Sequence, residues 1–103
     1  MKGDSYMGNI PNDQVLDKME HLLNIASDFT RLKILYAING EEKNVSQIVE
    51  EVGASQSLVS HQLKVLKKAK LVEVRRAGRQ VFYLLADHHV TELLNVVYNH
   101  VTE

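Results

Sequence analysis

The chain has 103 residues, a length that suits one domain and is too short for two. Its composition, 45% hydrophobic and 24% charged, is that of an ordinary globular protein with its own apolar core. We expect a cytoplasmic protein, because the sequence has no apolar run of about 18 residues and no apolar signal-peptide core near its N-terminus. The absence of cysteine excludes disulfides, thiolate metal sites and cysteine nucleophiles, so any bound metal is expected to have nitrogen and oxygen ligands.

The formal net charge of -1 conceals an uneven distribution of charges. Between Lys64 and Arg79 the chain has seven basic residues and one acid, Glu73, for a local charge of +6. The remainder has five basic and twelve acidic residues, for a charge of -7. A basic block is often only a solvated surface, but it is also typical of a surface that binds nucleic acid.

Apolar residues recur at three- and four-residue intervals in five stretches, each of which predicts an amphipathic helix. Pro11 precedes the first stretch, so we expect a flexible tail over residues 1–11 and one folded domain over residues 12–103. Gly40 and Gly53 predict the ends of the second and third helices. The predicted helices cover residues 12–25, 28–40, 46–52, 55–70 and 87–103.

Two strand-like segments, residues 71–76 and 80–85, separate the fourth predicted helix from the last. They are rich in Val, Tyr and Phe, which favour strands. Gly78 lies between them and tolerates the positive φ of a tight hairpin turn. The expected fold is therefore mainly α-helical with a two-stranded β wing, in the order of four helices, a hairpin and a final helix.

A short glycine-containing turn joins the third and fourth predicted helices, and a basic hairpin follows, which is the layout of a winged helix-turn-helix domain. In the fourth helix Val59, Leu63 and Leu66 are spaced to face inward, so polar side chains face outward. Gln, Ser and His can bond base edges in a major groove, and Lys and Arg can contact phosphates. The candidate DNA-binding residues are Gln56, Ser57, Ser60, His61, Lys64, Arg75, Arg76 and Arg79.

Three segments together resemble the ArsR/SmtB family of bacterial metal-sensing repressors. They are DFTRLKIL over residues 28–35, SQSLVSHQLKVLKKAKLV over residues 55–72, and the wing pattern RxGRxVFY over residues 76–83. The resemblance extends from about Leu22 to Tyr83. It implies a homodimeric winged helix-turn-helix protein in which the first and last helices form the dimer interface and the fourth helix reads operator DNA.

Four potential metal ligands, Asp87, His89, His100 and Glu103, lie in or beside the last predicted helix. At about 100° per residue, His89 and His100 lie about 20° apart around the helix axis, and Glu103 lies about 60° from His100. The two histidines are separated by about 16 Å along the axis, which is too far for one zinc ion. An antiparallel copy of the helix across a twofold axis would bring Asp87 and His89 of one subunit beside His100 and Glu103 of the other, giving two intersubunit sites per dimer.

Each of these ligands also has an ordinary structural explanation. The position of Asp87 is also explained by helix N-capping alone, and that of His100 and Glu103 by an ordinary polar helix end. His88 would replace His89 if the helix start were shifted by one residue. Together, however, the four resemble the zinc site in the C-terminal helix of the family's zinc sensors. The family's other site uses cysteines in the third helix, where this chain has VSQIV, so that site is excluded.

The residues and the resemblance together predict a zinc-responsive transcriptional repressor that binds operator DNA as a metal-free dimer and leaves it when zinc binds. Two alternatives stay open. One is the same repressor sensing cobalt or nickel, and the other is a winged-helix module that binds proteins without sensing metal. We do not expect an enzyme, because four protein ligands leave no open position on zinc for a water molecule.

Overall fold

The computed structural model describes residues 8–103 of the chain. Five helices and one two-stranded antiparallel sheet form a winged helix-turn-helix, so the predicted fold class is confirmed. The elements are α1 (Asp13–Ala26), α2 (Phe29–Ala37), α3 (Val45–Val52), α4 (Gln56–Lys68), β1 (Val72–Ala77), β2 (Gln80–Leu85) and α5 (His88–Thr102). The tail predicted over residues 1–11 falls mostly outside the described residues.

Each helix begins after a polar residue whose side chain accepts a hydrogen bond from the first turn. The five N-cap residues are Asn12, Asp28, Asn44, Ser55 and Asp87. Such a side chain stabilises the helix because it satisfies a backbone N–H that has no partner within the helix. At Asn44 the capping box is complete, since the Gln47 side chain accepts a hydrogen bond from the Asn44 backbone N–H in return.

The second helix is shorter than the sequence predicted, because α2 ends at Ala37 and not at Gly40. Ile38 caps the helix, and the chain then turns, with a hydrogen bond from the Glu41 N–H to the Ile38 carbonyl. Gly40 has a φ of 88° within this turn, so the glycine belongs to the turn and not to the helix end. Gly53, with a φ of 76°, directly follows α3 as expected.

The core is formed by the apolar faces of α2, α3 and α4. Its most buried side chains are no more than 1% exposed and include Ile34, Leu35, Ile38, Ile48, Val59, Leu63 and Leu66. The prediction that three residues of α4 face inward is therefore confirmed. Leu71 and Val72 extend this core to the base of the wing, so the wing and the helices share one apolar interior.

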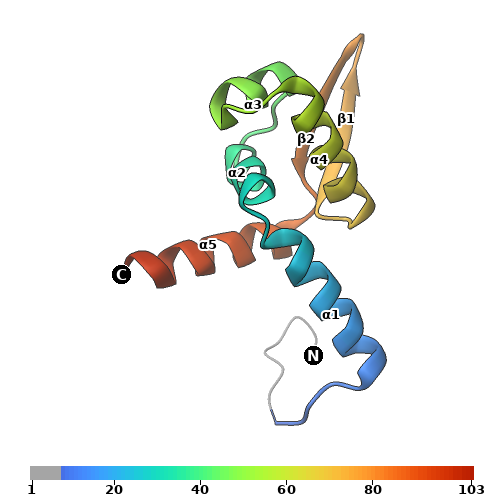
Figure 1. Cartoon of the computed structure of the whole chain (residues 1–103), viewed down its shortest axis with the longest axis vertical. Coiled ribbons are helices and arrows are strands. Elements are labelled where there is room, and N and C mark those ends of the chain that lie inside the picture. Colours follow the sequence, from blue (N-terminus) through green and yellow to red (C-terminus); the bar gives the residue numbers. More distant parts are fainter. Residues whose placement is uncertain (1–7) are drawn as a thin grey trace.

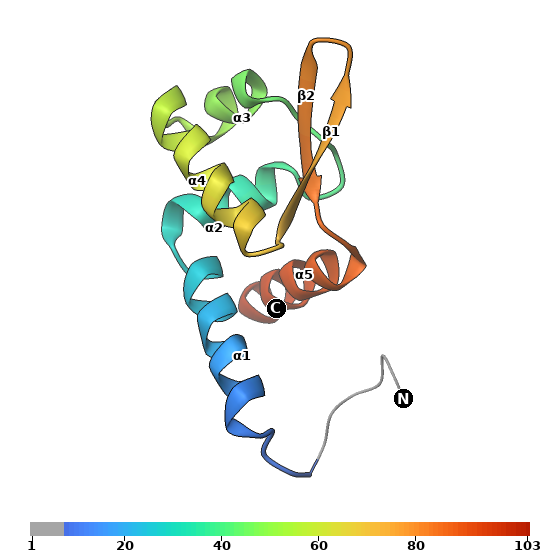
Figure 2. The same cartoon turned by 90° about the vertical axis from the view of Figure 1, so that its right-hand side faces the viewer.

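The wing runs along one side of α2, α3 and α4, and its tip projects from one end of the molecule (Figures 1 and 2). α1 and α5 lie toward the opposite end, below the other helices in Figure 1. In the wing, Val72 pairs with Leu85 at the base and Ala77 with Gln80 at the tip, where Gly78 has a φ of 63°. Over residues 8–103, no helix is both long enough and apolar enough to cross a membrane.

Candidate nucleic-acid interface and metal ligands

α4 presents a polar face on the side away from the core. Gln56, Ser57, His61 and Lys64 are exposed, and Ser60 is half-buried. Ser57, His61 and Lys64 follow one another at four- and three-residue intervals, so they share one face of the helix. The hydroxyl, amide and imidazole groups on α4 are of the kinds that hydrogen-bond base edges in a major groove.

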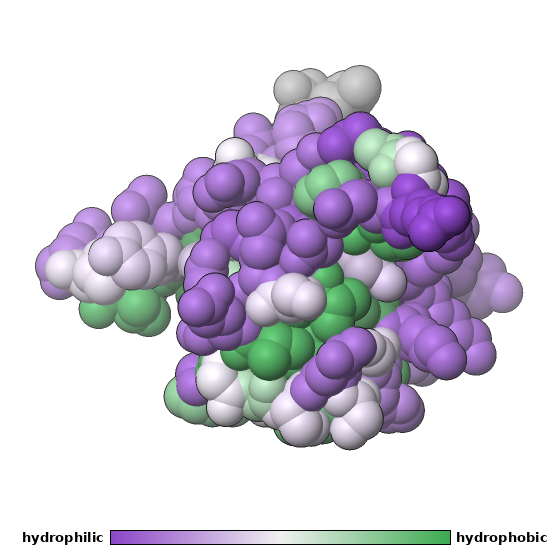
Figure 3. All heavy atoms as spheres, turned by 90° about the horizontal axis from the view of Figure 1, so that it is seen from above, coloured by the Kyte–Doolittle hydropathy of each residue, from purple (hydrophilic) through white to green (hydrophobic). Residues whose placement is uncertain are grey.

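The wing adds exposed cations beside this helix. Arg76 lies near the end of β1 and Arg79 lies in the turn, and both are exposed. Viewed from the end of the molecule that carries the wing tip and α3, the surface is mostly hydrophilic (Figure 3). Arg76 and Arg79 thus add positive charge to a polar end of the molecule, as contact with a phosphate backbone requires.

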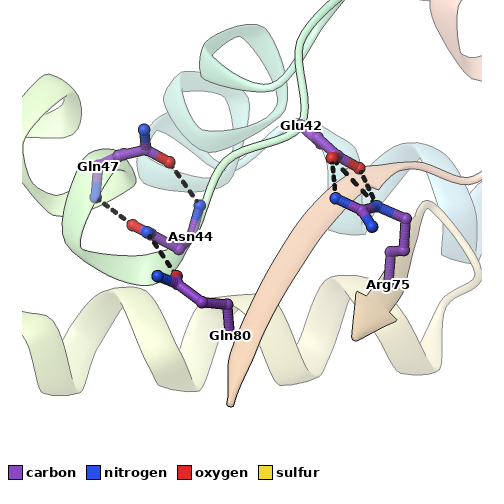
Figure 4. A network of polar contacts seen from close by, with 5 residues as sticks. All are labelled: Glu42, Asn44, Gln47, Arg75 and Gln80. Atoms are coloured by element: carbon purple, nitrogen blue, oxygen red, sulfur yellow. Dashed lines mark hydrogen bonds and ion pairs between the residues drawn. The ribbon is translucent and has the colours of Figure 1, made fainter. Parts of the chain in front are cut away.

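Arg75, the third wing arginine among the candidate DNA-binding residues, has a partner within the protein (Figure 4). Its Nε donates to the two carboxylate oxygens of Glu42 at 2.8 and 3.0 Å, and its Nη2 donates to Glu42 Oε2. The guanidinium also lies over the Phe82 ring, 5.0 Å from its centroid. The hydrogen bonds with Arg75 lower the pKa of Glu42, and those with Glu42 raise the pKa of Arg75.

The four predicted metal ligands lie at the two ends of α5. Asp87 caps the helix, and its Oδ1 accepts from the N–H of His89 at 2.9 Å. His89 Nδ1 lies 3.5 Å from the same oxygen, and both side chains are more than half exposed. His100 lies in the last turn and Glu103 follows it, both exposed. Within residues 8–103, no three His, Asp or Glu side chains are close enough to hold an ion, so one protomer does not assemble the predicted site by itself.

The chemistry of these donors suits zinc, which accepts imidazole nitrogen and carboxylate oxygen in a tetrahedral arrangement. A site with all four ligands would need a second copy of α5, because the two pairs lie at opposite ends of the helix. His88 begins the helix beside His89, with the two ring centroids 4.2 Å apart. His88 therefore lies next to the predicted ligand His89.

α1 and α5 expose apolar side chains toward solvent. Leu23 is 52% exposed, Val97 is 46% exposed and Val101 is 72% exposed. A groove of about 250 Å³ is lined by Leu23, Ala26, Ser27, Leu32, Tyr36, Leu93, Leu94 and Val97. Contiguous exposed apolar surface of this kind is typical of a protein–protein interface.

The structure also shows links that sequence reasoning missed. The Tyr36 hydroxyl donates to the Leu94 carbonyl at 2.7 Å, and Asn39 Nδ2 donates to Asn95 Oδ1 at 3.0 Å. Both bonds tie α2 and the turn after it to the middle of α5. No local sequence pattern signals such bonds, because the partners are more than 50 residues apart along the chain.

A second hollow places part of the predicted metal site beside the basic block. This hollow, about 650 Å³ in volume, is lined by residues from the end of α4 and the segment after it, from β1, and from the two positions before α5. Asp87 lines it together with Lys67, Lys70 and Arg76. One candidate metal ligand, Asp87, and one candidate phosphate contact, Arg76, thus line the same hollow.

Comparison with known proteins places these features in context. The model of the family "Bacterial regulatory protein, arsR family" matches residues 28–74, from the cap of α2 into β1. A transcriptional repressor SmtB homolog of Synechocystis is 37% identical over 86 residues, which are 84% of this chain and 65% of that protein. The HTH-type transcriptional regulator KmtR of Mycobacterium tuberculosis is 35% identical over 100 residues, which are 96% of this chain and 76% of that protein.

The fold has close counterparts among solved structures. One is a homodimeric winged helix-turn-helix DNA-binding domain from Mycobacterium bovis, described as a possible ArsR-family transcriptional regulator. It superposes with a TM-score of 0.79 at 27% identity, covering 92% of this chain and 90% of that one.

Proposed function

The chain belongs to the ArsR family of bacterial regulatory proteins, and we propose that it is a zinc-responsive repressor that binds operator DNA as a homodimer. Zinc binding would release the DNA. Members of this family are transcriptional regulators and not enzymes. The observation that carries the proposal is the placement of the candidate metal ligands at the two ends of α5, beside an apolar surface suited to a second copy of the chain.

DNA binding rests on the exposed polar face of α4 and on the wing. We assign base contacts to Gln56, Ser57, Ser60 and His61, and a phosphate contact to Lys64. Arg76 and Arg79 would reach neighbouring phosphates from the wing. The acidic charge of the rest of the chain favours approach to DNA with this end forward, because the other surfaces are repelled by phosphates.

Dimerisation rests on the apolar surface of α1 and α5. Exposing Leu23, Val97 and Val101 to water is unfavourable, and a twofold contact would bury the same surface from both protomers. The Mycobacterium bovis counterpart is homodimeric, which supports the same assembly here. A dimer also suits an operator with two half-sites about one helical turn, ~34–36 Å, apart.

In this dimer Asp87 and His89 of one protomer would share a zinc ion with His100 and Glu103 of the other. Twofold symmetry makes two such sites per dimer. Zinc would act as a cross-link between the two α5 helices and not as a catalyst, because four protein ligands complete its usual coordination. Cobalt accepts similar donors, whereas nickel prefers more ligands than these four residues supply.

The bonds between α5 and α2 provide a route from the metal to the DNA. A zinc ion that changed how the two α5 helices cross would pull on Tyr36 and Asn39 through their bonds to Leu94 and Asn95. Because α2 packs on α3 and α4 in the core, this displacement would alter the spacing of the two α4 helices. Zinc then favours a dimer that no longer matches both half-sites.

The experiment that tests the sensor is competition for zinc against a chromophoric chelator, since it needs no knowledge of the operator. We expect uptake of one zinc ion per protomer by the wild type, and an affinity more than about 100-fold weaker for His100→Ala. His88→Ala is the matched control and should bind zinc as the wild type does. Parallel titrations with cobalt and nickel separate the metal alternatives.

A DNA-binding assay completes the test. The probe is a duplex of about 30 base pairs selected by the wild-type protein from a random pool, long enough for two half-sites. Zinc should release the wild type from this duplex and leave His100→Ala bound. Weak zinc uptake that the His100→Ala substitution does not change would contradict the sensor role, and a failure to select any sequence would contradict the repressor role and favour a protein-binding module.

A further inference from the structure

The wing is attached to the segment before α3 by side chains as well as by the core. Arg75 of β1 holds Glu42 through both carboxylate oxygens (Figure 4). Glu42 lies in the chain between α2 and α3, so this ion pair joins the middle of the wing to the approach to the helix-turn-helix. Stacking on Phe82, the cross-strand partner of Arg75, further restricts the guanidinium.

Two more links lie beside this ion pair. The main chain of Lys43 pairs with that of Tyr83 through hydrogen bonds of 3.0 and 2.8 Å. The Asn44 amide nitrogen donates to Gln80 Oε1 at 3.3 Å, while the Asn44 oxygen caps α3 (Figure 4). Residues 42–44 therefore contact β1 and β2 at successive points, and the last of these contacts is made by the residue that caps α3.

Arg76 and Arg79 occupy different positions in the wing. Successive side chains of a strand point to opposite faces, so Arg76 lies on the other face of β1 from Arg75. Arg79 lies in the turn at the wing tip. Among residues 8–103 neither arginine forms an ion pair with an acidic side chain, in contrast to Arg75. The three wing arginines thus divide into one that is engaged within the protein and two that are available to a ligand.

We infer that Arg75 is a positioning residue that, together with Glu42, sets the angle of the wing relative to α3 and α4, and that it does not contact a phosphate. The inference rests on the proposed DNA-binding function. A phosphate contact by Arg75 would break its paired hydrogen bonds with Glu42 and leave that carboxylate unpaired beside the negative DNA backbone. The lowered pKa of Glu42 and the raised pKa of Arg75 both favour the charged forms of the pair in the free protein.

Replacing Glu42 by the neutral Gln distinguishes a positioning role of Arg75 from a phosphate contact, because the two roles predict opposite changes in DNA affinity. Removing a negative charge near DNA should strengthen binding if electrostatics alone matter. If Glu42 positions the wing through Arg75, Glu42→Gln should instead weaken binding to the selected duplex, by at most about fivefold, which corresponds to losing the whole contribution of one exposed ion pair. Glu41→Gln is the matched control, because Glu41 is the exposed neighbouring acid in the same segment.

The salt dependence of binding provides the second readout. Removing one cation that neutralises a phosphate lowers the slope of log K against log salt by about 0.9. We expect Arg76→Ala to lower the slope in this way. Arg75→Ala should weaken binding about as much as Glu42→Gln, with the slope unchanged, and the double variant should be no weaker than either single variant. Fluorescence anisotropy with the selected duplex measures all of these, and circular dichroism melting verifies that each variant is folded.

Three results would overturn the inference while leaving the repressor role intact. The first is tighter binding and a steeper salt slope for Glu42→Gln, which would make Arg75 a phosphate contact that Glu42 restrains. The second is a slope lowered by about 0.9 for Arg75→Ala. The third is an unchanged affinity for both variants. If the wild type selects no sequence at all, the repressor role itself fails and the inference fails with it.

Discussion

The Tyr36 hydroxyl donates a 2.7 Å hydrogen bond to the carbonyl oxygen of Leu94, and so connects α2 with the middle of α5 across 58 positions of sequence. Tyr36 is half-buried and also lines the apolar groove beside α1 and α5. Its position lets one side chain contact both the helix that carries the candidate metal ligands and the core that supports α4. A change in the orientation of α5 would therefore act directly on α2.

Tyr36→Phe removes this bond and leaves the Leu94 carbonyl without the hydroxyl. We expect a decrease of about 1 kcal/mol in the free energy of unfolding, the usual net contribution of one hydrogen bond, measured by urea denaturation. The variant should also bind zinc normally but show a smaller effect of zinc on DNA affinity. Tyr83→Phe is the control, because Tyr83 pairs with Lys43 through its main chain. If Tyr36→Phe and Tyr83→Phe changed the free energy of unfolding and the effect of zinc on DNA affinity equally, a specific role for the Tyr36 hydroxyl would be contradicted.

Val97→Glu places a charge in the apolar groove between α1 and α5. We expect the proposed dimer to dissociate, because a carboxylate buried in an apolar interface loses its hydration without gaining a partner. Sedimentation equilibrium should then report a monomer over concentrations at which the wild type is dimeric. Asn99→Glu adds the same charge to an exposed part of α5 about 180° around the helix from Val90 and should leave the assembly unchanged. A dimeric Val97→Glu variant would show that the interface lies elsewhere.

Lys64→Ala and Arg79→Ala remove candidate phosphate-binding cations from α4 and from the wing tip. Each should lower the salt slope of DNA binding by about 0.9 for every phosphate that is no longer neutralised, and should weaken binding to the selected duplex and to a mixed-sequence duplex alike. Lys18→Ala, on α1, serves as the control and should not change the slope. If the salt slope of DNA binding did not change in either Lys64→Ala or Arg79→Ala, the phosphate contacts would have to be made by other residues.

The ion pair between Glu42 and Arg75 predicts a dependence of stability on pH. Because Arg75 lowers the pKa of Glu42 in the folded protein, the pair stabilises the fold at neutral pH, and this contribution disappears as the pH falls through the lowered pKa. Urea denaturation should therefore find the wild type more stable than Glu42→Gln at about pH 7, and this difference should shrink as the pH falls through the lowered pKa of Glu42. Glu41→Gln should differ little from the wild type at either pH. A difference that persists in acid would mean that the pair is held by contacts other than charge.

The helices and the wing could be predicted from the sequence because their causes are local. Apolar residues at helical spacing on α4 identified Val59, Leu63 and Leu66 as core residues, and all three are buried. Side-chain caps such as Ser55 and Asp87 act within three residues of the helix start, so they can be recognised without a tertiary structure. The end of α2 was predicted wrongly, because a glycine permits a positive φ but does not determine which residue of a turn adopts it.

Helix geometry could also relate His89, His100 and Glu103 around one helix, since the rise and the turn of an α-helix are constant. The partners of Arg75 and Tyr36 could not be predicted from the sequence. Glu42 and Arg75 are 33 residues apart, and both lie at the surface, where many charged residues are available as partners. Their pairing depends on how the wing packs against the segment before α3, and that packing follows from the burial of the whole core. Local sequence thus defines the helices and strands and their polar faces, whereas the packing of the core decides which surface side chains pair within the protein and which are available to bind DNA.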